Sequence, residues 1–178
     1  MSIQIVPVGD IDPAVLNMLQ QELGRVFNQE VPVGRSMSLP TDAFNPRRNQ
    51  YAAEIVLHTV SEHTRPTGSD RTVAVVDADL YVQSLNFVFG LAGGRTALFS
   101  LHRLRQSFYN LPENPVIFYR RVLTEAIHEL GHTYGLEHSS DSSSVMFFSN
   151  SIEDTDRKGP EFNKAEKERL IQLGAIRQ

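Results

Sequence analysis

The most constraining feature of this 178-residue chain is a set of histidines spaced for one helix and the turn after it. His128 and His132 are four residues apart, so on a helix they project from one face, one turn apart. Gly135 follows three residues after His132 and can adopt left-handed backbone angles, which end a helix and turn the chain sharply. This turn is expected to bring His138 round as a third imidazole. The spacing therefore predicts a helix that ends near Gly135.

Three imidazoles at this spacing can hold one zinc ion and leave its fourth position open, which is typical of catalytic zinc sites. Glu129 lies beside the first histidine and can take a proton from zinc-bound water. The alternative is a pair of helical histidines with an accidental third. Met146, eight residues after His138, is either a core residue or part of a methionine-containing turn beneath the metal site.

Composition excludes several classes of protein. Without cysteine the chain has no disulfides, thiolate zinc sites or cysteine nucleophiles. A net charge of −4 argues against nucleic acid or an anionic membrane as a partner. No apolar run approaches the roughly 20 residues of a membrane span, and the N-terminus has no basic signal region. We therefore expect a cytoplasmic protein, and we also expect it to be a monomer.

Strand and helix signals alternate along the chain, which predicts an α/β sheet with helices packed on it. The run 72–76 is continuously apolar, as a strand buried on both faces should be. Asn45-Pro46, like Asp12-Pro13 and Asn114-Pro115, is interpreted as a helix start. Further strands are expected at 3–6, 31–39, 85–89 and 96–101, with a turn at 90–94, and helices at 13–27, 46–61, 115–134 and 164–173.

The motif HExxHxxGxxH from His128 to His138, followed by Met146, resembles the metzincin clan of zinc metallopeptidases. Within that clan the chain resembles the archaemetzincin (archaelysin) family, because of the short interval before Met146 and the segment 145–151. Asp156, Lys158 and Phe162 also fit that family. The resemblance spans residues 71–170, whereas the first 60 residues are compatible without being diagnostic.

The resemblance implies one metalloprotease-like domain over residues 1–178, with an N-terminal subdomain (1–135) and a C-terminal subdomain (136–178). It implies a twisted mixed sheet with long helices packed on it, a zinc helix ending at Gly135, and a small C-terminal part with a Met-turn at Met146 and a terminal helix. The implied activity is hydrolysis of peptide bonds by zinc-activated water, with Glu129 as general base and the ligands His128, His132 and His138.

In this clan a peptide substrate lies antiparallel along an edge strand of the sheet. Thr96–Leu101 is our candidate for that edge, and the alternative is an ordinary strand paired on both sides.

The chain departs from the family in its cysteines, and it lacks a tyrosine that some other members of the clan carry. Archaemetzincins typically carry four cysteines that bind a second, structural zinc, and the aligned positions here are Ser139, Ser144, Asn163 and Glu166. We therefore expect one zinc rather than two, with a capping box from Asn163 to Glu166 as a partial replacement. Some metzincins place a tyrosine just after the Met-turn, where this chain has Phe147 and Phe148, which cannot donate a hydrogen bond.

Two other functions stay open: an inactive or weakly active peptide-binding protein on a metallopeptidase scaffold, and a zinc hydrolase of a non-peptide amide. Isolated histidines such as His58, His63 and His102 are interpreted as solvated or core residues. Asp77 and Asp79 either stabilise a turn or act as acid–base groups or partners of a zinc histidine.

Overall fold

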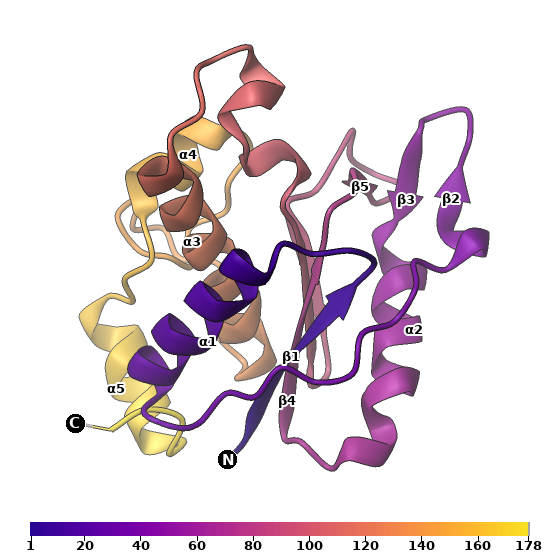
Figure 1. The fold of residues 1–178 in the computed structure, drawn as a ribbon. Coiled ribbons are helices and arrows are strands. Elements are labelled where there is room, and N and C mark those ends of the chain that lie inside the picture. Colours follow the sequence, from indigo (N-terminus) through magenta and orange to yellow (C-terminus); the bar gives the residue numbers. More distant parts are fainter. Residues whose placement is uncertain (178) are drawn as a thin grey trace.

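The computed structural model describes residues 1–177 and is built around a four-stranded mixed sheet (Figure 1). Its strand order is β1-β4-β7-β6. The strands β1, β4 and β7 are parallel, and β6 runs antiparallel to β7. Their bounds are Ile3–Val8 for β1, Arg71–Val76 for β4, Gly90–Gly93 for β6 and Thr96–Ser100 for β7. The predicted α/β class with a mixed sheet is confirmed.

Helices cover both faces of this sheet (Figure 1). On one face α1 (Pro13–Phe27) and α3 (Pro115–Thr133) pack on the side chains of Ile5, Val73 and Phe99. On the other face α2 (Ala53–Thr64) packs on residues that alternate with them, such as Ala74 and Leu98. Burial on both faces explains why the strand at 71–76 is continuously apolar rather than alternating.

Local capping explains where three helices begin. The side chain of Asp12 accepts from the Ala14 amide at the start of α1, and Asn114 accepts from two amides at the start of α3. The helix α5 (Lys164–Gln172) begins at Asn163 with the predicted capping box to Glu166. A further short helix, α4 (Ile152–Lys158), was not predicted.

The predicted helix start at Asn45-Pro46 is wrong. The Asn45 side chain accepts from the Arg47 amide and closes a turn instead. This turn joins β2 (Phe44–Asn45) to β3 (Gln50–Ala52), which form a small sheet with β5 (Leu80–Tyr81), and α2 begins only at Ala53. Single 3₁₀ turns occur at Thr41–Ala43, Arg65–Thr67, His102–Leu104 and Gln106–Tyr109.

Two of the predicted strands do not form. Residues 31–39 and 85–89 form only isolated bridges, such as Ile5 with Val33 and Leu80 with Val88. The strand β6 lies directly after the second of these segments, in the glycine-rich residues Gly90–Gly93, which were predicted to be a turn. The turn itself is at Gly94, where the backbone has a φ of 57°.

The predicted edge strand at 96–101 is also wrong, because β7 lies between β4 and β6. All five residues of β7 are buried, as an interior strand requires. Within residues 1–177, β6 has β7 as its only sheet partner. The two edges of the four-stranded sheet are therefore β1 and β6. None of the helices over these residues is long and apolar enough to span a lipid bilayer.

Candidate metal centre and active site

Three histidines converge at the end of α3. Nε2 of His132 lies 3.2 Å from Nε2 of His128 and 3.1 Å from Nε2 of His138. In a tetrahedral zinc site with Zn–N bonds of about 2.0–2.1 Å, ligand nitrogens are about 3.3 Å apart. The ligand atoms of all three residues lie within 4.8 Å of one another, and they form the one such His/Asp/Glu group found over residues 1–177. The arrangement could hold a metal ion.

Backbone carbonyls orient two of these rings. Nδ1 of His128 donates to the Val145 carbonyl at 2.7 Å, and Nδ1 of His132 donates to the Leu136 carbonyl at 2.8 Å. A carbonyl can only accept, so the proton of each neutral ring is on Nδ1 and Nε2 carries a lone pair. Lone pairs this close repel unless a cation lies between them. The donor set therefore fits a zinc ion.

The turn after α3 delivers the third histidine. The Leu136 amide donates to the Gly131 carbonyl, and the Gly135 amide donates to the His132 carbonyl. This pair of hydrogen bonds is a Schellman motif, and Gly135 has the positive φ of 82° that the motif needs. The chain then reverses, so that the ring of His138 lies 4.7 Å from that of His132, measured between centroids.

Met146 lies beneath this end of α3. Its side chain has no exposed surface, and a methyl group added to Gly131 would lie 2.4 Å from Met146 Sδ. The methionine therefore packs directly on the helix backbone at Gly131, between the first two histidines in sequence.

Glu129 lies against the edge strand. Its residue is 5% exposed, and a methyl group added to Gly90 would lie 2.6 Å from Glu129 Oε1 and 2.5 Å from the Leu98 carbonyl oxygen. Only glycine lets the carboxylate approach β6 this closely. Sequence reasoning missed Gly90 because it assigned this residue to a turn.

A cavity of about 360 Å³ opens between β6 and the end of α3. His128, His132, His138 and Glu129 line one side of it, and its remaining wall is mostly apolar. The apolar side chains are those of Val82, Leu85, Val88, Leu91, Ala92 and Phe148.

Burial sets the electrostatics of the site. It holds the pKa of His128 well below its ordinary value, and the nearby Lys158 ammonium acts in the same direction. Burial also lowers the pKa of His132 and of His138. The pKa of Glu129 is raised well above its usual range by burial and by the neighbouring Glu125 carboxylate. Unprotonated imidazoles are the form that binds metal.

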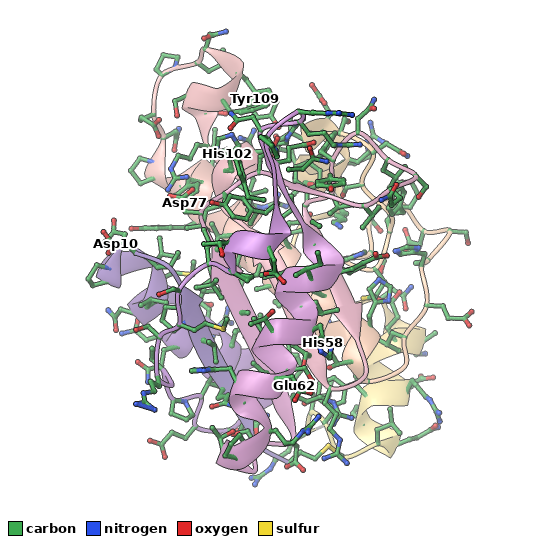
Figure 2. All side chains as sticks on the ribbon, turned by 90° about the vertical axis from the view of Figure 1, so that its right-hand side faces the viewer. Asp10, His58, Glu62, Asp77, His102 and Tyr109 are labelled. Carbon is green, nitrogen blue, oxygen red and sulfur yellow. The ribbon has the colours of Figure 1, made fainter. Side chains whose placement is uncertain are left out.

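The other histidines join no such group in the described part of the chain. His58 lies on α2, well apart from His102 and Asp77 (Figure 2). Nε2 of His63 bonds the Arg35 carbonyl at 3.1 Å, and the ring of His102 packs edge-on against Phe108.

Asp77 and Asp79 pair with arginines rather than with the zinc histidines. Arg105 bonds both carboxylate oxygens of Asp77, and Arg103 bonds both oxygens of Asp79 at 2.7 and 2.8 Å. Burial opposes ionisation of Asp79, but the hydrogen bonds and charge of Arg103 prevail and lower its pKa. These ion pairs hold the loops beyond the strand ends, so the turn-stabilising interpretation fits both residues.

Three of the four residues aligned with the family's cysteines are connected by hydrogen bonds. Oγ of Ser144 donates to the Glu166 carboxylate, with 2.7 Å to each oxygen. The same hydroxyl accepts from the Met146 amide at 3.0 Å. Glu166 Oε2 accepts from the Asn163 amide at 2.8 Å. Ser139 is outside this cluster but forms a single bridge with Phe147.

Comparison with known proteins places the chain among peptidases. A family model described as Peptidase family M54 matches residues 23–172. The curated archaemetzincin of Methanocaldococcus jannaschii is 41% identical over 160 residues, which cover 89% of this chain and 86% of that relative.

Solved structures agree. The crystal structure of archaemetzincin from Archaeoglobus fulgidus, complexed with malonate, has a TM-score of 0.81 and 32% identity, covering 95% of this chain and 99% of that one. That of archaemetzincin from Methanopyrus kandleri has a TM-score of 0.83 and 33% identity, covering 97% and 94%.

Proposed function

The chain belongs to peptidase family M54 and is a zinc metallopeptidase, and we propose that it hydrolyses peptide bonds at the three-histidine centre with Glu129 as general base. The resemblance to archaemetzincins drawn from the motif is confirmed by the family match and the relatives. The observation that carries the proposal is the convergence of three imidazole Nε2 atoms beside a buried carboxylate.

His128, His132 and His138 would hold the zinc through Nε2. When bound in such a site, zinc lowers the pKa of a water molecule and polarises a carbonyl oxygen. The chain contributes the orientation: the carbonyls of Val145 and Leu136 hold two rings in the ligating tautomer. Gly135 turns the chain so that His138 completes the set, and Met146 supports the helix from below.

Glu129 would accept the proton of the attacking water and deliver it to the leaving amine. Its place supports this role, because it follows a ligand directly in sequence and lines the same cavity as all three imidazoles. Contact with the Gly90 backbone restricts where its carboxylate can lie. A base with few available positions loses little entropy in reaching the reacting atoms.

A peptide would bind along β6. The strand is the edge of the sheet on the side of Glu129, so its free backbone groups can pair with an extended substrate. β7 cannot take this role because both of its edges are occupied. The apolar wall of the cavity would then receive a substrate side chain.

We also propose that the chain uses a single zinc. Ser144, Asn163 and Glu166 would connect the C-terminal segment by hydrogen bonds where relatives are expected to use cysteine-bound metal. The one-domain organisation, the monomeric state and the cytoplasmic location stay predictions.

The test compares wild type, Glu129→Gln and Glu129→Ala on a peptide library, with zinc and with chelator. Removal of a general base is expected to lower kcat by about 10²–10⁴-fold while zinc content per chain stays at one. If wild type binds zinc and peptides but cleaves none, the inactive peptide-binding alternative is correct. If Glu129→Ala cleaves as fast as wild type, Glu129 is not the base.

A further inference from the structure

A lysine is buried behind the metal centre. Lys158 is the last residue of α4 and its side chain is 0% exposed, whereas the other two lysines of the chain, Lys164 and Lys167, are on the surface. A buried ammonium is unfavourable unless charge and hydrogen bonds compensate it. Its contacts therefore indicate what it does there.

The ammonium joins two segments of the chain. Nζ of Lys158 donates to the Phe147 carbonyl at 3.0 Å and lies 3.4 Å from Oε1 of Glu125, which is itself buried on α3. That carboxylate oxygen also accepts from the Thr155 hydroxyl at 2.9 Å. Nζ is 3.2 Å from Nδ1 of His128, but this is a packing contact, because that Nδ1 already donates to the Val145 carbonyl.

The Phe147 carbonyl belongs to a turn of residues 145–148, and this turn contacts two of the three histidines. At its start, the Val145 carbonyl orients the ring of His128. At its end, the ring of Phe148 packs on that of His138, with 5.0 Å between centroids. The Phe147 carbonyl lies between these two contacts and faces the ammonium.

We propose that Lys158 is a positioning residue of the metal centre. Its ammonium, balanced by Glu125, ties the 145–148 turn to α3, so that the Val145 carbonyl holds His128 in the ligating orientation. The inference rests on the metal role proposed above for the three histidines. Residues that orient metal ligands typically change metal affinity by about 10–100-fold when replaced.

The experiment measures binding of Zn²⁺ and Co²⁺ to the metal-free protein by chelator competition, together with the visible spectrum of the Co²⁺ form. Lys158→Met is expected to bind Zn²⁺ about 10–100-fold more weakly and to alter the Co²⁺ spectrum. Lys158→Arg keeps a cation that can donate to the Phe147 carbonyl, so it should recover part of the affinity.

Two controls separate positioning from general stability. Val60→Ala opens a cavity on the opposite face of the sheet, and Lys164→Met removes a surface ammonium. Both should bind metal as wild type does. If Val60→Ala loses affinity as strongly as Lys158→Met, affinity merely follows stability and the proposal is wrong.

A double variant addresses the buried charge. Glu125→Gln with Lys158→Met removes both buried charges, so it should fold even if Lys158→Met alone is too unstable to be measured. Its Zn²⁺ affinity should stay low, because the Phe147 carbonyl remains unanchored. Wild-type affinity and an unchanged Co²⁺ spectrum in the double variant would mean that Lys158 only neutralises Glu125. If instead His132→Ala binds Zn²⁺ as wild type does, the metal site itself has been misassigned.

Discussion

Replacing Glu166 by alanine tests whether hydrogen bonds hold the C-terminal segment in the absence of a second metal. Glu166 is 9% exposed and connects two elements. It caps α5 through the Asn163 amide, and it accepts from Ser144, whose hydroxyl in turn accepts from the Met146 amide. Alanine removes both connections at once.

The magnitude follows from these contacts. Loss of the reciprocal cap costs about 1 kcal/mol, and a buried Ser144 hydroxyl left without its acceptor costs about 1–3 kcal/mol. A decrease of about 2–4 kcal/mol in the free energy of unfolding lowers the Tm of a chain of this size by roughly 5–15 °C.

The assay is thermal unfolding with chelator present, so that bound zinc adds nothing to the measured stability. Glu168→Ala is the matched control, because this carboxylate is 61% exposed on the same helix and has only a surface contact with Lys164. Glu166→Gln keeps acceptors for Ser144 and the cap and should lie close to wild type. Equal Tm values for Glu166→Ala and Glu168→Ala would refute the reasoning.

Three further predictions concern packing and charge. Gly90→Ala should lower kcat/KM because its methyl group would lie 2.6 Å from the Glu129 carboxylate and 2.5 Å from the Leu98 carbonyl oxygen, so that the carboxylate or the β6 backbone must shift. Gly93→Ala on the same strand meets only the flexible Leu57 side chain and should be active, and equal activities of the two variants would contradict this. Gly131→Ala should lower stability in urea unfolding by about 1–3 kcal/mol because it overpacks against Met146, and unchanged stability would show that the methionine moves freely. The lowered pKa of Asp79 means that its pair with Arg103 stabilises the fold fully above the unfolded-state pKa of about 4, and this stabilisation is lost as pH falls through the lower folded-state pKa. Asp79→Asn should therefore destabilise the protein most at pH 7 and progressively less as pH falls below about 4, and an equal loss across this range would exclude the ion pair as the cause.

Sequence alone was enough where the physics is local. Capping side chains act on amides two or three residues away, so the starts of α1, α3 and α5 could be predicted. The same holds for the convergence of the histidines, because helical spacing and one left-handed glycine determine it. The error at Asn45 has the same origin, since an Asn-Pro pair can close a turn as readily as it begins a helix.

Tertiary structure decided everything that depends on which distant segments meet. Whether β6 or β7 is the edge follows from strand order, and the approach of Gly90 to Glu129 follows from that order. Lys158 and Glu125 are 33 residues apart in sequence, and nothing near either of them indicates a buried pair. Spacing within one helix determines which side chains share a face, whereas the partners of that face are set only when the helix packs against the rest of the chain.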